Sequence, residues 1–155
     1  MKELVNLLIK MNKTISTMES CTGGGISNAI TNIPDASKVF NFSAITYSND
    51  YKKKMGVAPK IIDKYTVYSV ETSCAMAKAI SDYTESSYGV GVTGKLKKFD
   101  ENNPYGEDDV VYLSVYDREK NEYHNKKIKL HYEERCDNKK EIIDNFVSLM
   151  MEIIC

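Results

Sequence analysis

Ser20 stands directly before a glycine-rich turn. It follows a short apolar stretch, and Gly23, Gly24 and Gly25 come next, before a segment of helical character. Glycine lets the backbone approach a ligand closely, and the start of a helix offers free N–H groups. The segment therefore predicts a site for an anion or a polar carbonyl group, with Ser20 as a candidate nucleophile. On spacing alone, the same residues also fit a plain helix cap, which is the commoner case.

Two other interpretations of this turn are disfavoured. The glycines match neither G-x-x-x-x-G-K-[ST] nor G-x-G-x-x-G, so the sequence argues against nucleotide binding through those two folds. Cys21 is a nucleophile by type, but a cysteine at such a position is more often a small packing residue. No histidine lies near it in the sequence to activate the thiol.

A nucleophilic serine needs a base, and the sequence offers a lysine more readily than a histidine. His124 and His131 fall in late segments that read as exposed strands. Lys52 could take a proton if burial lowers the pKa of its amine, and Tyr47, at the end of a predicted strand, could relay that proton. A run of three lysines, 52–54, is usually a solvated helix face, so its spacing does not single out Lys52.

Apolar periodicity predicts the elements that would position these residues. We expect helices over 1–12 and 25–31, two short helical pieces within 50–65, a helix after the N-cap Ser69, and a last helix capped by Asp137. We expect strands over 14–18, 39–47, 88–92 (closing on Thr93 and Gly94), 110–116 and 122–132, with a long polar loop over 95–109. Helices between the early strands and a late hairpin predict an α/β fold of three α/β/α layers around a mixed, mostly parallel sheet.

Composition limits the possible classes of protein. A chain of 155 residues, 42% hydrophobic, has the size of one globular domain, 1–155. Its 21 basic and 22 acidic residues give no general reason to bind nucleic acid or an anionic membrane. No apolar run has the length of a membrane span and the first residues are amphipathic, so we expect a cytoplasmic protein. Four scattered cysteines without a C-x-x-C pair, with only two histidines, predict neither a zinc site nor a disulfide framework. We expect no cofactor.

Several motifs, taken together and in order, closely resemble the CinA C-terminal domain family. They are ESCTGG at 19–24, Pro34, Ser37, Phe40, TYSN at 46–49 followed by Lys52, Gly56, Val57, Ser69, and the Met76-Ala77 pair. The resemblance runs from about Lys13 to Gly94 and continues more faintly to the end. ESCTGG together with TYSNxxK is a specific pair of motifs.

The resemblance implies an activity and a site. It implies a nicotinamide-nucleotide amidase, which hydrolyses nicotinamide mononucleotide to nicotinic acid mononucleotide and ammonia, in a compact α/β domain that commonly self-associates. It implies a catalytic set of Ser20, Tyr47 and Lys52, with no metal. Backbone N–H groups around 22–24 would hold the oxyanion. We expect the following residues to bind the substrate or hold the geometry of its site: Glu19, Cys21, Thr22, Gly23, Gly24, Thr46, Asn49, Thr93, Gly94 and Arg135.

The sequence departs from the family at the loop that helps form the substrate pocket in relatives. Where the family has TGIAGPxGG, residues 93–99 read TGKLKKF, and the later KPVG is replaced around 106–109. Lysine side chains have replaced backbone amides and could hold a phosphate or form a solvated basic turn. Phe42 and Ser43 replace a glycine and a basic residue. Arg135 and Lys139 fall where relatives carry an acidic-Arg pair and further arginines, and they fit either phosphate or subunit contacts or, as the commoner case, ordinary surface charge.

Three functions from different classes remain open at this point. The first is the amidase. The second is a catalytically silent homologue that binds a nucleotide or a protein partner. The third, a nucleic-acid-binding role in recombination, has least support because the charge is balanced. Larger CinA proteins carry an additional N-terminal domain, so we expect a stand-alone protein here, most simply a homodimer.

Overall fold

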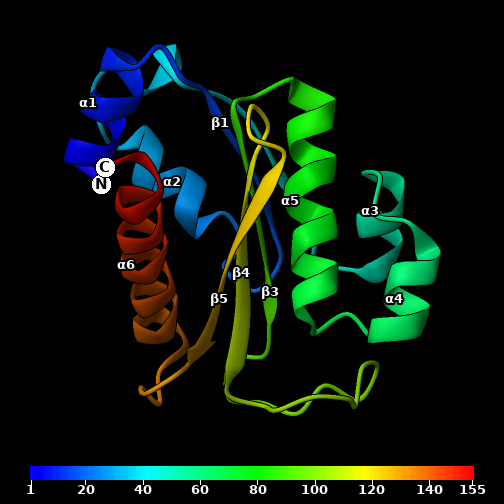
Figure 1. Cartoon of the computed structure of the whole chain (residues 1–155). Helices are drawn as coiled ribbons and strands as arrows, with labels where there is room; N and C mark the ends of the chain where they lie inside the picture. The colour runs from blue at the N-terminus through cyan, green and yellow to red at the C-terminus, as the bar shows by residue number, and fades with distance from the viewer.

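The computed structural model describes residues 1–155 and shows a five-stranded sheet between two layers of helices (Figure 1). The strands are β1 (Ile15–Glu19), β2 (Phe40–Ile45), β3 (Tyr88–Gly94), β4 (Val110–Asp117) and β5 (Glu122–Lys129). The helices are α1 (Lys2–Lys10), α2 (Gly25–Thr31), α3 (Asn49–Lys54), α4 (Pro59–Tyr65), α5 (Val70–Thr84) and α6 (Arg135–Ile154), with a short 3-10 turn, η1 (Ala36–Lys38). None of these helices combines the length and the hydropathy that a membrane-spanning segment needs.

The sheet has the order β2-β1-β3-β4-β5. Strand β1 pairs in parallel with both β2 and β3, whereas β4 pairs antiparallel with β3 and with β5. Four of the five strands therefore run in one direction and β4 runs against them. This confirms the predicted α/β fold with a mixed, mostly parallel sheet.

Each face of the sheet has its own apolar core. Helices α1, α2 and α6 cover one face, and α5 covers the other, with α3 and α4 beyond it (Figure 1). The larger core includes Leu8, Ile26, Val115 and Phe146, and the smaller one joins Met18 of β1 to Met76 and Ile80 of α5. All five residues of β1 are buried, as expected for a central parallel strand covered on both faces.

Two glycines of β3 let α5 pack directly against the strand. A Cβ atom at Gly89 would lie 2.0 Å from the carbonyl oxygen of Ala77, and one at Gly91 would lie 2.1 Å from that of Ser73. Both oxygens belong to the backbone of α5, so neither can move aside as a side chain would. The alternation of glycine with Tyr88, Val90 and Val92 therefore fixes the distance between this helix and the sheet.

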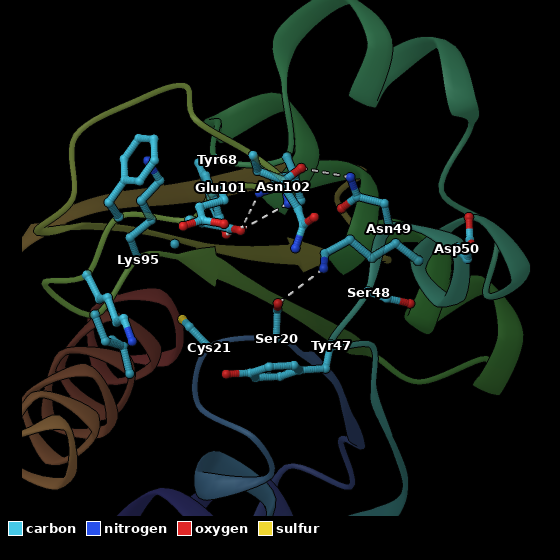
Figure 2. Close-up of a pocket in the computed structure, with 18 of the residues that line it drawn as sticks. Ser20, Cys21, Tyr47, Ser48, Asn49, Asp50, Tyr68, Lys95, Glu101 and Asn102 are labelled. Atoms are coloured by element: carbon cyan, nitrogen blue, oxygen red, sulfur yellow. Dashed lines mark hydrogen bonds between the residues drawn. The ribbon is translucent and has the colours of Figure 1, made fainter.

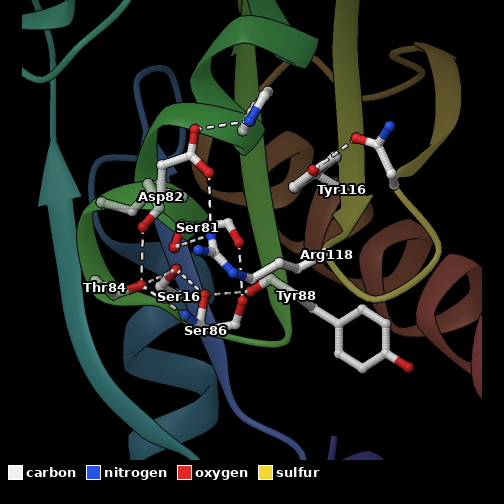
Figure 3. Close-up of polar contacts among 11 residues, drawn as sticks. Ser16, Ser81, Asp82, Thr84, Ser86, Tyr88, Tyr116 and Arg118 are labelled. Atoms are coloured by element: carbon white, nitrogen blue, oxygen red, sulfur yellow. Dashed lines mark hydrogen bonds and ion pairs between the residues drawn. The ribbon is translucent and has the colours of Figure 1, made fainter.

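A network of hydroxyl groups ties the end of α5 to the sheet, at the edge where β1 and β3 begin (Figure 3). Ser16 Oγ lies 2.6 Å from Ser86 Oγ and accepts a hydrogen bond from Thr84 Oγ1 at 3.0 Å. Ser81 Oγ donates to the carbonyl of Ser86 at 2.8 Å. These bonds satisfy buried polar groups and hold α5 in place at the edge opposite the chain reversal after Glu19.

The structure confirms most of the predicted elements and corrects several ends. The helix over 25–31 has the predicted bounds, and Ser69 caps α5 by accepting a hydrogen bond from Thr72 N. The expectation that Asp137 caps the last helix is wrong, because α6 begins at Arg135 after Glu134 and Asp137 lies in its first turn. The strand expected over 122–132 ends at Lys129.

Candidate functional site

Ser20 and Lys52 meet on the floor of a cavity of about 710 Å³ at the carboxyl end of β1 (Figure 2). Lys52 Nζ lies 3.1 Å from Ser20 Oγ and donates to the carbonyl oxygen of Thr46 at 2.8 Å. The chain turns from β2 into α3 here, and Ser48 caps that helix by accepting a hydrogen bond from Tyr51 N. Lys52 lies on the face of α3 that turns inward, where it is buried.

The three lysines of α3 have different surroundings. Lys52 is 1% exposed, whereas Lys53 and Lys54 are exposed. Burial lowers the pKa of the Lys52 amine to about 8, because the apolar surroundings disfavour the ammonium form. The nearby Cys21 acts weakly in the opposite direction. At this pKa a useful fraction of the amine is neutral near pH 7 and can accept a proton from Ser20.

Tyr47 lies beside this pair without bonding to it. Its ring lies beneath Ser20 in Figure 2, and its side chain is 66% exposed. Its hydroxyl accepts a long hydrogen bond, 3.5 Å, from the guanidinium of Arg135 and makes no hydrogen bond to Ser20 or Lys52. Of the expected catalytic set, the structure joins Ser20 to Lys52 and places Tyr47 in the lining of the cavity.

Glu19, the residue before Ser20, is a fully buried carboxylate. Its Oε2 accepts hydrogen bonds from Thr22 Oγ1 at 2.6 Å and from the amides of Gly24 and Ile26, both at 3.1 Å. Its Oε1 accepts from the amide and hydroxyl of Ser27, both at 2.8 Å, and from Thr17 Oγ1 at 3.2 Å. The start of α2 therefore binds an anion, as the glycine turn predicted, but that anion is the protein's own side chain.

The turn after Ser20 leaves two amides free. Gly23 and Gly24 have φ of 59° and 93°, a left-handed conformation that glycine adopts at little cost. The Gly23 amide donates to the carbonyl of Ser20, and Glu19 takes that of Gly24. Only the amides of Cys21 and Thr22 lack a protein acceptor in this turn. This corrects the expected oxyanion donors, because the amides of Gly23 and Gly24 are already occupied.

The expected substrate-binding residues divide into two groups. Four of them line the cavity: Cys21, Asn49, Gly94 and Arg135. Six do not line it: Glu19, Thr22, Gly23, Gly24, Thr46 and Thr93. Thr93, for example, is fully buried and donates its hydroxyl hydrogen to the carbonyl of Val67. Burial raises the pKa of the Cys21 thiol to about 12, which keeps it protonated and unreactive at neutral pH.

The loop over 95–109 supplies much of the cavity wall, and sequence reasoning did not foresee how firmly it is held. The side chain of Lys95 is 1% exposed, pairs with Asp108 at 2.9 Å, and lies 5.3 Å from the ring centre of Tyr68. This lysine is therefore not part of a solvated basic turn. It is a buried structural cation held by a carboxylate and an aromatic face.

The tip of the same loop is bound at two further points (Figure 2). Asp100 accepts hydrogen bonds from Tyr68 Oη at 2.5 Å and from Asn103 Nδ2 at 2.9 Å, and these bonds lower the pKa of its carboxyl group. Asn103 Oδ1 in turn accepts from Asn49 Nδ2 at 2.9 Å. Asn49 begins α3, so the loop tip is joined to the helix that carries Lys52. No pattern in the sequence pairs these residues, which lie 32 to 54 positions apart.

The cavity wall also carries charges that are free to meet a ligand. Lys98 and Glu101 line the cavity, are exposed and have no ion-pair partner. Arg135 makes only two long hydrogen bonds, of 3.4 and 3.5 Å. No three His, Cys, Asp or Glu side chains lie close enough to hold a metal ion. The cavity can therefore offer a nucleophile, a base and groups of both charges to a small polar molecule.

Comparisons with known proteins find one family. The family model described as the CinA C-terminal domain matches residues 1–154. A relative from Acetivibrio thermocellus, printed as "Putative competence-damage inducible protein", is 43% identical over 89 residues, which are 57% of this chain and 22% of that protein. A "CinA-like protein" from Endomicrobium trichonymphae is 38% identical over 119 residues, 75% of this chain and 27% of the relative. The chain thus spans about a quarter of the length of these relatives.

Solved structures show the same fold. A competence-damaged protein (CinA) superfamily protein from Klebsiella pneumoniae aligns over 99% of this chain and 94% of its own, with a TM-score of 0.90 and 15% identity. A competence/damage inducible protein from Agrobacterium tumefaciens aligns over 96% of this chain and 94% of its own, with a TM-score of 0.80 and 24% identity. At these identities the likeness supports the fold and leaves the chemistry to the residues themselves.

Proposed function

Because the chain belongs to the CinA C-terminal domain family, we propose that it is an amidohydrolase that cleaves a carboxamide through an acyl-enzyme on Ser20. The observation that carries the proposal is the contact between a buried lysine and a serine, 3.1 Å apart, on the floor of an open cavity. The substrate we propose is nicotinamide mononucleotide, which would give nicotinic acid mononucleotide and ammonia.

The first step is proton transfer from Ser20 to the neutral amine of Lys52 while Oγ attacks the amide carbon. The carbonyl of Thr46 accepts one N–H of the amine, and the lone pair of the neutral amine faces Ser20 Oγ when the proton is transferred. The free amide of Cys21, the residue after the nucleophile, is a suitable donor to the developing oxyanion. Lys52 then returns the proton to the leaving nitrogen, ammonia departs, and water cleaves the ester.

The phosphate of the substrate must be held away from the start of α2, because Glu19 already occupies those amides. Arg135 and Lys98 are the free cations in the cavity lining. A guanidinium can bind phosphate through two parallel N–H groups, and its present bonds are long enough to exchange for such a ligand. Tyr47, bonded to Arg135, would then contact the substrate at the same end.

Release of ammonia from nicotinamide mononucleotide tests this proposal. We expect Ser20→Ala and Lys52→Met each to reduce kcat/KM by about a thousandfold or more, since each removes one member of a unit that acts together. Lys53→Met is the matched control: it changes the neighbouring, exposed lysine of the same helix and should leave the rate unchanged.

Tyr47→Phe separates two roles for the phenol. If Tyr47 contacts the substrate together with Arg135, the substitution raises KM. If Tyr47 relays a proton, the substitution lowers kcat. No release of ammonia by the wild-type protein above the level of Ser20→Ala would retire the amidase and leave a homologue that binds a ligand without cleaving it.

A further inference from the structure

We propose that Glu19 is a positioning residue for this reaction: its buried carboxylate holds the turn after Ser20 in the one arrangement that keeps the Cys21 and Thr22 amides free. This inference rests on the proposed acyl transfer. It assigns Glu19 no contact with the substrate, because the residue is 0% exposed and does not line the cavity.

The first support is the set of hydrogen bonds that Glu19 accepts. Each of its two oxygens accepts three, from donors on both sides of Ser20: Thr17 before it, and Thr22, Gly24, Ile26 and Ser27 after it. A buried carboxylate is costly unless its oxygens are fully bonded, and here they are. The side chain thus gathers the strand end, the turn and the first turn of α2 around one charge.

The second support is the pattern of backbone hydrogen bonds in the segment 20–24. The Ser20 amide donates to the carbonyl of Val92, and the Ser20 carbonyl accepts from the Gly23 amide. With Gly24 bound to Glu19, both ends of the segment 20–24 are fixed to neighbouring structure. The amides of Cys21 and Thr22, between these fixed points, are the ones without a protein acceptor. Oxyanion donors act by being held in place before the reaction, and Glu19 supplies that hold.

Glu19→Gln is the informative change because it keeps the size of the side chain. An amide group has one oxygen, so its NH2 must face donors that now meet a carboxylate oxygen. We expect the turn to relax, kcat for ammonia release to fall by about a hundredfold, and KM to stay within about twofold. The pH midpoint set by Lys52 should remain near 8, since Glu19 does not bond to that amine.

Asp117→Asn is the matched control. Asp117 is also a buried carboxylate that accepts backbone amides, those of Glu119 and Lys120, but it lies at the opposite end of the sheet. The same chemical change there should lower stability and leave kcat unchanged. Equal losses of kcat in the two variants would reduce the role of Glu19 to general stability and overturn the inference.

A second readout separates this inference from the proposed function. The rate at which a fluorophosphonate labels Ser20, followed by intact mass, depends on the serine, its base and the oxyanion donors, and not on recognition of a nucleotide. If the wild type is labelled and Glu19→Gln is labelled at the same rate, the positioning role of Glu19 is overturned and the proposed acyl transfer is not. A wild type that neither labels nor releases ammonia overturns the acyl transfer, and this inference with it.

Ser27→Ala decides the matter if Glu19→Gln does not fold. It removes one donor to Glu19 Oε1 from a partly exposed position outside the cavity. We expect labelling of Ser20 to slow by about threefold, and an unchanged rate would overturn the inference.

Discussion

Replacing Lys52 by methionine removes a buried ammonium group and keeps an unbranched side chain of similar length. The lysine is 1% exposed, and its pKa falls from 10.5 to about 8 because burial penalises the charged form. The unfolded chain therefore binds this proton more tightly than the folded protein does. Burial of the charged Lys52 amine lowers the free energy of unfolding, and this penalty is fully present below about pH 7. As the pH rises from about 7 toward 10.5, the amine loses its proton and the penalty disappears.

The difference between pKa values of 10.5 and about 8 corresponds to a penalty of about 3 kcal/mol at pH 7. The same relation gives about 2 kcal/mol at pH 9 and about 1 kcal/mol at pH 10. The substitution also loses the hydrogen bonds to Ser20 and Thr46, at about 1 kcal/mol each. We therefore expect the variant to be inactive, more stable than the wild type by about 1 kcal/mol at pH 7, and equally stable near pH 9.

Urea unfolding of both proteins at several values between pH 6 and pH 10 measures this difference. Titrations of other groups cancel between the two proteins, so the changing difference reports Lys52 alone. Lys53→Met, at the exposed neighbouring position, should keep a constant offset from the wild type. A constant offset for Lys52→Met as well would mean that the amine titrates in its ordinary range, and a neutral base at position 52 would be refuted.

Four further results are expected. Between pH 7 and pH 9, kcat/KM should rise about tenfold, following the neutral fraction of Lys52, and a flat profile would contradict the assignment of the base. Tyr68→Phe removes the bond to Asp100 and should increase hydrogen exchange over 95–109 and raise KM, with kcat little changed; a fall in kcat alone would argue against a wall role for the loop. Ser69→Ala removes the N-cap of α5 and should lower the free energy of unfolding by about 1 kcal/mol, measured in urea. Gly91→Ala places a methyl group 2.1 Å from the α5 backbone and should prevent stable folding, measured by circular dichroism, so a normal melting curve would contradict the close approach.

Most helices and strands of this protein could be predicted from the sequence because the residues that begin and end them act locally. Gly24 ends its turn in a left-handed conformation, and α2 begins at the next residue, as the glycine run indicated. Asp137 misled because aspartate is a common N-cap, but the side chain of Asn138 binds the backbone of Tyr132 at both its N–H and its carbonyl. That clamp brings the chain into α6 before Asp137 is reached.

The site was predictable only in part, for reasons that lie in the tertiary structure. Three identical lysines carry no periodic signal, so only packing of α3 against the floor of the cavity distinguishes Lys52 from its neighbours. Glu19 was expected only to bind the substrate or hold the geometry of its site, and its burial depends on strands β2 and β3 on both sides of β1. The contacts of Asp100 and Asn103 come from distant parts of the chain and have no local signature.

The floor and the wall of the cavity belong to separate stretches of the chain. Ser20 and Lys52 are fixed by β1, α2 and α3, while most of the wall comes from a single connection between β3 and β4 that begins and ends on adjacent strands. A segment anchored in this way can be exchanged without moving the reacting pair, provided that the bond between its tip and Asn49 of α3 is kept. Grafting the corresponding connection from a relative onto this scaffold is thus a direct way to change the amide that binds in the cavity. The reaction proposed for Ser20 and Lys52 would stay the same.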